Sequence, residues 1–530
     1  MSQRRAASMP SRRDLLVGAA ALGAAGAAGP AILRRPVHAQ EPRPGGVLKV
    51  AIIGEPPSLD AHWTTASLTY DVTSHLYEPL FTLDERYGVV PMLAEGHTVA
   101  DDGKTWTIRL RRGVPFHNGK ECSAEDVVAS LTRWGRIASV GKILFKNVQS
   151  FQAKDRYTVE LRFGGCSGPV LAALGNATSQ FPAIYPKEVV EAAGDGQIKD
   201  FVGTGPFRFV ERVPDRYTRM ARFDKYAARG DATTGYGGRR TAYVDEVQFI
   251  PVPDVSVRAA GVESGEYHFS DWIAPDNYER LTRNAKLDVM LVKPNEWVSA
   301  IFNKKQSPFT NRLLRQAFVA ALDMEPIMKA AVGAPEFYRL DPSLIFREQV
   351  WWSDVGKDVY NRPDKEKAKR LMREAGYKGE PIRWMATQFY DWMYKSALAA
   401  KQQLEDVGFN IDLQVLEWAT VVQRRNDPKL YDVFTTGIGF NTDPSQMVVL
   451  TCDWPGWTCD SKLDALQSRL ACETDFARRK AVWEEIQRWF WDEVPVVKLG
   501  DFFTLRVKQK SVVGYANRYR PFFWNVGIRT

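Results

Sequence analysis

Residues 93–134 combine three local patterns in one order, and this order constrains the fold more than any other part of the chain. Apolar and polar side chains alternate over 105–110, which predicts a half-buried strand. The Asp-Gly pair at 102–103 predicts a tight turn before that strand. Ser123 then precedes apolar residues at helical spacing, and Asp126 lies three positions later, as in a capping box. We therefore predict a strand and then a capped helix.

This stretch, LAEGHTVADDGKTWTIRLRRGVPFHNGKECSAEDVVASLTRW, resembles the signature of the family 5 extracellular solute-binding proteins. Members of that family are dipeptide, oligopeptide and nickel receptors of ABC importers. The resemblance extends from about Gly45 to the C-terminus. Its other segments are GGVLKVA (45–51), EPPSLDAH (55–62), GTGPF (203–207), SPFTNRLLRQAFVAALDMEPI (307–327) and EKAKRLMREAGY (366–377).

The resemblance implies an α/β fold, that of a two-lobed periplasmic binding protein (type II, cluster C) with an extra α/β subdomain. Periodicity over 382–437 supports it, because strand and helix patterns alternate there and favour a parallel, doubly wound sheet. We expect the lobes to be connected, and to hinge, near 293–302 and near 494–499. The predicted parts are a leader (1–39), lobe I (40–83, 184–298 and 494–530), the extra subdomain (84–183) and lobe II (299–493).

The leader resembles a twin-arginine export signal. Residues 11–16, SRRDLL, precede an Ala- and Gly-rich run, and Val37-His38-Ala39 fits a cleavage site. A transmembrane anchor is the alternative, but the run is weakly apolar and is closed by Pro30 and an Arg pair. The leader contains no Cys that a lipid would modify. We therefore expect a periplasmic protein that is not lipid-anchored.

Net charge does not indicate nucleic-acid binding. The chain has 71 Lys and Arg against 63 Asp and Glu. Residues 1–39 hold six of the basic residues and one acid, which leaves 65 against 62. No basic run that would follow a phosphate backbone is present in the sequence, so we expect no nucleic-acid partner.

Cysteine spacing suggests one disulfide. An oxidising compartment permits disulfides, and an odd number of Cys leaves at least one thiol free. Cys452 and Cys459 flank a Pro-Gly turn, which makes them the candidate pair. The alternative is that all the Cys are reduced and buried. The five Cys of the chain are Cys122, Cys166, Cys452, Cys459 and Cys472.

The candidate ligand loop follows a predicted strand at 431–437. In open α/β sheets, ligands bind beyond the carboxyl ends of strands, which places residues 438–444 at a site. Peptide-binding family members carry there a Trp and then an Asp that pairs with the α-ammonium of the peptide. Ile438 and Asn441 occupy these positions, and an amide cannot neutralise an ammonium. Asp443 would supply that charge, or would instead cap a turn.

Five further residues are candidates for contact with the ligand. Phe440 belongs to the same loop. Trp418 lies where the family places an aromatic residue, with core packing as the alternative. Thr64, Tyr70 and Trp297 are candidates because family members line the cleft from the loop after the first strand and from the segment that crosses between the lobes.

Catalytic patterns are sparse in the sequence. It contains neither a zinc-protease HExxH pattern nor a GxSxG nucleophile elbow. The Gly-rich segment 203–207 lacks the Lys-Ser or Lys-Thr of a phosphate loop. We therefore expect no catalytic residue, no metal and no cofactor. The histidines beyond the leader are predicted to lie in turns or at the surface: His62, His75, His97, His117 and His268.

The resemblance thus implies a receptor that captures a peptide or peptide-like small solute between two lobes. Its expected partners are an inner-membrane ABC permease and the ATPase subunits of that permease, and we expect a monomer. The sequence leaves the solute open among peptides, opines, sugars and metal chelates. Two other classes also stay open: a secreted hydrolase on the same scaffold, and a solute-sensing module that is not coupled to transport.

Overall fold

A computed structural model describes residues 42–64, 66–100, 102–167, 169–178, 180–388 and 390–529. The predicted leader and its cleavage site lie outside these residues. Contacts group the chain from residue 41 onward into one unit. Lobe I, the subdomain and lobe II serve below as names for its parts, and their boundaries stay a prediction. Within the described ranges, no helix combines the length and apolar character needed to cross a membrane.

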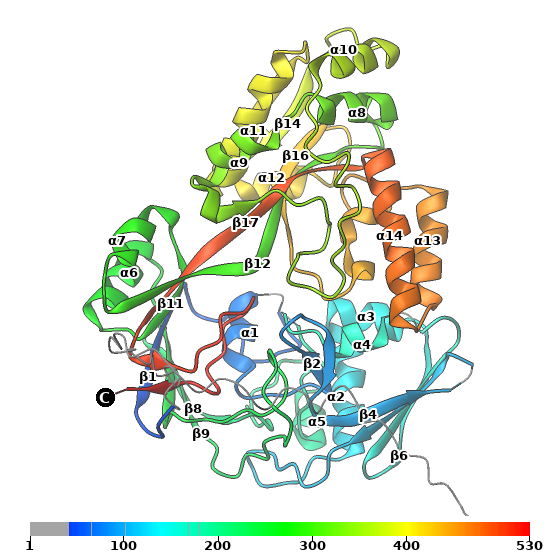
Figure 1. Ribbon diagram of the computed structural model, residues 1–530. Coiled ribbons are helices and arrows are strands. Elements are labelled where there is room, and N and C mark those ends of the chain that lie inside the picture. Colours follow the sequence, from blue (N-terminus) through cyan, green and yellow to red (C-terminus); the bar gives the residue numbers. More distant parts are fainter. Residues whose placement is uncertain are drawn as a thin grey trace, which may run out of the picture. The chain divides into compact units, whose positions relative to one another are not determined.

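One large sheet passes through both lobes (Figure 1). Its two long central strands pair antiparallel from Leu287, opposite Gln509, to Ile301, opposite Val496. Three strands of lobe II lie beyond the first strand of this pair, whereas the strands of lobe I and one two-residue strand of lobe II lie beside the second. The predicted connection at 293–302 lies within the first strand, and the one at 494–499 overlaps the start of the second. The order is β15 (Ile411–Val415), β14 (Ile382–Ala386), β16 (Val433–Gly439), β12 (Leu287–Phe302), β17 (Val496–Gln509), β11 (Phe269–Ile273), β1 (Val47–Ile52), β10 (Glu246–Pro251), β9 (Tyr217–Arg222) and β8 (Phe207–Val213), and β13 (Tyr338–Arg339) also pairs with β17.

The pairing of β12 with β17 is irregular. Its register shifts between Val292 and Glu296 and again between Val298 and Ser299. At the first shift, residues 293–295 of β12 face a single residue of β17, because Val292 is opposite Thr504 while Glu296 is opposite Phe502. Extra residues in one strand bend it and change the direction of its side chains. The sheet is therefore bent where it passes from one lobe to the other.

Lobe II confirms the prediction of a parallel sheet, but only in part. β14 pairs parallel with both β15 and β16. β16 then pairs antiparallel with β12, so the parallel part ends after three strands. Asp364 caps α10 as its position predicts, because its Oδ1 accepts the N–H of Lys367 (2.8 Å). The helices of this lobe are α8 (Arg312–Ala320), α9 (Met324–Val332), α10 (Lys365–Glu374), α11 (Asp391–Glu405), α12 (Trp418–Arg424), α13 (Ser461–Cys472) and α14 (Phe476–Glu493).

Lobe I contains the other half of the sheet. β1 pairs parallel with β10 and with β11, so the first strand of the described residues becomes central. Its buried residues Leu48 and Val50 pack in a core with aromatic residues of the C-terminal tail, including Phe523. The prediction that the tail returns to lobe I therefore agrees with this packing. The helices are α1 (Ser67–Thr73), α5 (Lys187–Ala193), α6 (Val255–Ser264) and α7 (Tyr278–Thr282).

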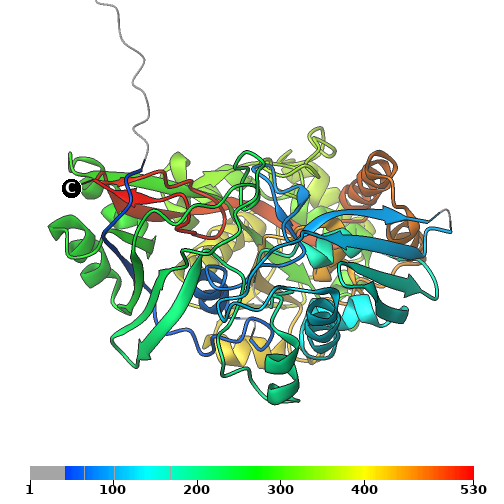
Figure 2. The ribbon, with the colours of Figure 1, turned by 90° about the horizontal axis from the view of Figure 1, so that it is seen from below.

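The subdomain contains residues 93–134, the stretch that resembles the family signature (Figure 2). The predicted strand at 105–110 is β5, and the capping box of α2 is present, because the N–H of Ser123 donates to Asp126 Oδ2 (2.9 Å). Both predictions are confirmed. The sheet order is β4 (Ala94–Val99), β5 (Thr105–Leu110), β7 (Thr158–Phe163) and β6 (Val148–Asp155), accompanied by α2 (Ala124–Ile137), α3 (Ser139–Phe145), α4 (Val170–Leu174) and the hairpin β2 (Phe81–Leu83) and β3 (Val89–Pro91).

His62 and His75 lie in turns, as predicted, but both are fully buried, which the sequence did not indicate. Arg133, on α2, forms a buried ion pair with Asp60 (2.6 Å) and also contacts His62 Nδ1 (3.1 Å). Burial lowers the pKa of His62 to about 4, so the imidazole is neutral at pH 7. The Arg133 side chain therefore ties the subdomain to the first loop of lobe I.

Two disulfides are present among the described residues. Cys452 and Cys459 are bonded, which confirms the predicted pair. Cys166 and Cys472 form a second disulfide, which the sequence analysis did not predict. The remaining thiol, Cys122, is free and buried.

Candidate functional site

The candidate ligand loop begins two residues later than predicted. β16 continues to Gly439, so Ile438 is part of the strand and lies opposite Trp297 of β12. The segment that remains is residues 440–443, which we call the 440–443 loop; its Phe440, Thr442 and Asp443 are buried. It ends at Pro444, where a short 3₁₀ helix (Pro444–Gln446) begins.

Phe440 is the point at which this loop meets the rest of the chain. Its ring lies between Tyr87 (centroids 4.9 Å apart) and Tyr519 (4.7 Å). Tyr519 belongs to the C-terminal tail and Tyr87 to the start of the subdomain region, so three distant segments meet at one aromatic cluster. Offset and edge-on packing of such rings stabilises the contact. The cluster places the loop at the interface between the lobes.

Asn441 is half-buried and held from both ends. Its Nδ2 donates to the carbonyl of Gly439 (3.1 Å), and its own carbonyl accepts from Gln349 Nε2 (2.7 Å). Gln349 thus fixes the backbone of the loop at Asn441.

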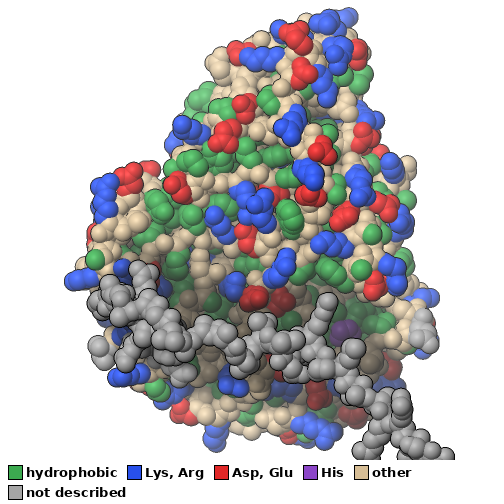
Figure 3. Space-filling model, viewed as in Figure 1, with side chains coloured by type: hydrophobic (Ala, Val, Ile, Leu, Met, Phe, Trp, Pro, Cys, Tyr) green, Lys and Arg blue, Asp and Glu red, His purple; other side chains and the backbone are tan. Residues whose placement is uncertain are grey.

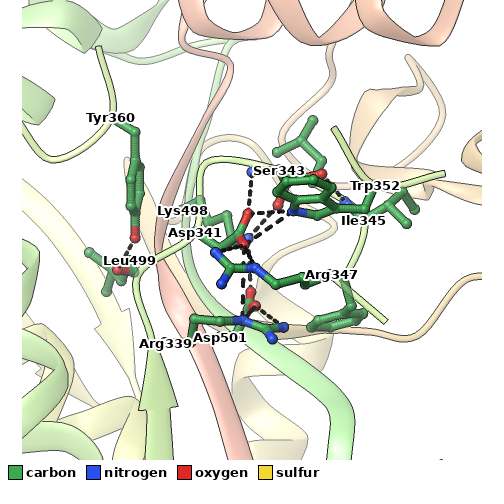
Figure 4. A network of polar contacts seen from close by, with 12 residues as sticks. Arg339, Asp341, Ser343, Ile345, Arg347, Trp352, Tyr360, Lys498, Leu499 and Asp501 are labelled. Atoms are coloured by element: carbon green, nitrogen blue, oxygen red, sulfur yellow. Dashed lines mark hydrogen bonds and ion pairs between the residues drawn. The ribbon is translucent and has the colours of Figure 1, made fainter. Parts of the chain in front are cut away.

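A buried polar network holds the segment that carries Gln349 (Figure 4). Asp341 accepts a hydrogen bond from Trp352 Nε1 (3.1 Å), and Lys498, on β17, donates to the carbonyl of Ser343. Lys498 also forms an ion pair with Asp501 of the same strand (2.8 Å). The network therefore connects residues 341–352, which contact the 440–443 loop through Gln349, to β17.

Asp443 has an internal partner. Its side chain is 1 % exposed and forms two hydrogen bonds with Arg479 of α14 (2.7 and 3.0 Å). It also caps the following 3₁₀ helix, because Oδ1 accepts the N–H of Ser445 (3.0 Å). Its geometry is that of a capping residue, which is the alternative that the Asp-Pro pair suggested. Removing one partner of such a buried pair would leave an uncompensated charge.

The other predicted residues are spread over several surroundings. Trp297 is buried beside Ile438, with Lys498 Nζ 5.7 Å from the centre of its ring. Trp418 is half-buried at the start of α12 and packs edge-on against Tyr390 (5.5 Å). Tyr70 is buried against Phe181, and Thr64 Oγ1 accepts the N–H of Ala66 (3.1 Å). Phe440, Asn441 and Asp443 thus share one loop and Trp297 lies opposite Ile438 of the strand before it, whereas Trp418, Tyr70 and Thr64 have these separate contacts.

A small polar cavity lies where β12 and β17 separate. Its volume is about 20 Å³, and four of its residues carry charge. This set was missed in the sequence, although Pro294-Asn295-Glu296 interrupts an apolar alternation and would have marked it. Its lining, which defines the polar cavity, is Asp271, Trp272, Val292, Asn295, Glu296, Thr504, Arg506, Tyr519 and Arg520.

Charges at the polar cavity are mostly paired. Arg506 binds Asp271 (2.9 Å), and Arg520 lies 3.8 Å from Asp71 of α1. Burial raises the pKa of Asp71 to about 6 and also raises the pKa of Glu296. Buried polar atoms nearly always have partners, and those without one point to water or to a ligand. Four such atoms without a partner among the described residues are Asn295 Nδ2, Arg506 Nε, Arg520 Nε and Asp71 Oδ1.

A second, largely apolar cavity of about 370 Å³ lies between the subdomain and lobe II. Tyr87 lines it and also contacts Phe440, so the aromatic cluster separates this apolar cavity from the polar one. On the face of the molecule shown in Figure 3, positively and negatively charged side chains are intermixed. The main apolar lining residues are Val89, Trp106, Val170, Leu171, Val350, Trp351 and Phe476.

The fold is that of a class of two-lobed binding proteins. The substrate-binding protein CtaP of an ABC transporter from Listeria monocytogenes superposes with a TM-score of 0.79 at 23 % identity, over 92 % of this chain and 100 % of that one. A probable peptide ABC transporter periplasmic-binding protein of Sinorhizobium fredii is 28 % identical over 87 % of this chain and 90 % of its own. The oligopeptide-binding protein AppA of Bacillus subtilis is 27 % identical over 77 % and 76 %.

The family follows from a match along the sequence. Residues 88–456 match the profile of the bacterial extracellular solute-binding proteins, family 5 Middle. The chain belongs to this family, whose members are binding proteins. The family resemblance of the 93–134 stretch is thereby confirmed, and the predicted type II periplasmic binding protein fold agrees with the solved structure.

Proposed function

We propose that the protein is the periplasmic substrate-binding component of an ABC importer. It captures a peptide or peptide-like small solute between lobe I and lobe II and delivers it to a permease and its ATPase subunits. The names of the relatives support the transport role and the peptide class. The observation that carries the proposal is the polar cavity, because its unpaired buried groups lie at the junction of the lobes, where a captured solute would complete their hydrogen bonding.

In this proposal β12 and β17 form the hinge. They are the paired strands that pass between the lobes, and the register shift beside Glu296 gives them a bend. A ligand that contacts both lobes stabilises the closed state, and its apparent affinity falls if that state is rare in the empty protein. The protein acts as a monomer, without turnover, after export through the twin-arginine route.

The proposal is tested with the purified mature protein. Solute released by denaturation is identified by untargeted mass spectrometry, and the emptied protein is then titrated with peptides, opines, sugars and metal chelates. We expect at least one solute to raise the melting temperature and to reduce the radius of gyration in solution scattering. Failure of every solute in both measurements would contradict a receptor function, and conversion of a bound solute to product would favour the hydrolase instead.

A further inference from the structure

Of three carboxylates at or beside the polar cavity, two lie beside guanidinium groups and one does not. Asp271 pairs with Arg506, and Asp71 lies beside Arg520. Glu296 is the third carboxylate of this group, and it forms no hydrogen bond or ion pair with any residue in the described ranges. The guanidinium groups of Arg506 and Arg520, which also line the cavity, bind or lie beside Asp271 and Asp71 instead. A negative charge in such surroundings is costly unless a cation accompanies it.

Glu296 has space that the absence of a side chain at Gly437 creates. It lies opposite Gly439 in the pairing of β12 with β16. A β-carbon added at Gly437 would lie 2.2 Å from Glu296 Oε2, whereas one added at Gly439 would lie 4.0 Å from Glu296 Cγ. The carboxylate thus occupies the surface of β16 that a side chain at residue 437 would fill. This strand leads directly into the 440–443 loop.

The surroundings of the carboxylate suit a small cation. The same point above Gly437 lies 3.1 Å from Cη2 of Trp392, so an aromatic ring lies close to the charge. Aromatic faces attract ammonium groups. The cavity, at about 20 Å³, has room for a group of about the size of one water molecule.

A second polar group in the cavity indicates what lies next to that cation. Asn295 is 3 % exposed, and its Nδ2 has no acceptor among the described residues. A carbonyl oxygen beside the cation would accept this hydrogen bond. An ammonium with an adjacent carbonyl is the chemistry of an α-amino acyl group, as at the free N-terminus of a peptide.

We propose that Glu296 binds the primary ammonium of an α-amino acyl group, with Asn295 donating to the adjacent carbonyl. Glu296 then supplies the negative charge that Asn441 cannot supply. The inference rests on the proposed receptor function and deepens it, because it moves recognition of the cation from the 440–443 loop to the bend of β12.

The test uses trialanine and N-acetyl-trialanine, which differ in the charge of the terminal nitrogen. Isothermal titration of the wild-type protein should give at least 30-fold tighter binding of trialanine. Glu296→Gln keeps the shape of the side chain and should weaken trialanine at least 10-fold while changing the acetylated peptide less than 3-fold. Gly437→Ala should reproduce this loss, because its methyl group displaces the carboxylate, whereas Gly439→Ala should not.

The outcomes separate the two proposals. Equal binding of both peptides by the wild type, or unchanged trialanine binding by folded Glu296→Gln, would overturn the role of Glu296. Binding of neither peptide would also overturn it. The receptor function would still stand if an opine, sugar or metal chelate from the wider panel bound, and would fail only with the whole panel. Melting curves of the variants show whether each is folded before titration.

Discussion

Cys166 and Cys472 are bonded to each other across 306 positions of sequence. Cys166 lies between β7 and α4 of the subdomain, and Cys472 is the last residue of α13 in lobe II. The subdomain is inserted in lobe I, so this disulfide is a covalent link between the lobes in addition to β12 and β17. Lobe II is thus attached to the remainder of the chain by this disulfide as well as by β12 and β17.

Removing this disulfide should cost more stability than removing the other one. In the chain-entropy model, the stabilisation grows with the loop that a disulfide closes, from about 2.5 kcal/mol for a very short loop to about 6 kcal/mol for one of some three hundred residues. The loops here span 306 and 7 positions. Urea unfolding should therefore show a larger loss for Cys166→Ser/Cys472→Ser than for Cys452→Ser/Cys459→Ser. Equal losses would contradict the entropic account.

The same double variant tests opening. If the Cys166–Cys472 bond restrains the lobes, its removal should raise the radius of gyration of the empty protein in solution scattering. The radius with bound solute should change little, because the ligand holds the lobes together. The variant that lacks Cys452–Cys459 is the matched control, since that bond lies within one part of lobe II. An unchanged radius in the empty double variant would show that the link does not limit opening.

Asp443 and Asn441 should give different phenotypes. Asp443→Ala leaves the Arg479 guanidinium without its buried partner, and breaking such a pair typically costs about 3–5 kcal/mol. Asn441→Ala removes one hydrogen bond, to the carbonyl of Gly439, and should cost about 1 kcal/mol. We expect Asp443→Ala mainly to lower the free energy of unfolding in urea. Asn441→Ala should mainly lower the affinity for solute in a titration. Equal destabilisation of both variants would mean that Arg479 is not the main partner of Asp443.

Local signals made the subdomain predictable. The alternation at 105–110 and the Ser123–Asp126 cap depend on neighbours within a few residues, so the sequence contains them in full. The pair Cys452 and Cys459 was found for the same reason. Cys166 and Cys472, by contrast, are brought together only by the tertiary fold, and no local sequence pattern indicates that they pair.

The site was harder to predict because its partners are remote. From the sequence alone, Asp443 is either a turn residue or a group that binds the ligand. The structure shows instead that it pairs with Arg479, 36 positions later. Glu296 follows a proline in a strand, and only the register of β12 against β16 brings it over Gly437. The burial of His62 was not predicted for a related reason, since Arg133, which packs against Asp60 and His62, comes from another part of the sequence.

His117 should make the junction of the subdomain with lobe I sensitive to acid. Its Nδ1 accepts the N–H of Gly203 (3.2 Å) and its Nε2 lies 3.1 Å from the carbonyl of Gly205, an arrangement for the neutral ring. Burial lowers the pKa of His117 from 6.5 to about 4. The unfolded chain therefore binds a proton between these values while the folded one does not, so stability falls as the pH falls through this window.

The expected loss from this one histidine is about 2 kcal/mol between pH 7 and pH 5, since one pKa unit corresponds to about 1.4 kcal/mol. His117→Asn removes the titrating ring and keeps groups that can donate and accept hydrogen bonds. Urea unfolding at pH 7, 6 and 5 should show a shallower pH dependence for this variant, even if it is less stable at pH 7. Parallel pH profiles of the variant and the wild type would show that His117 does not cause the acid sensitivity.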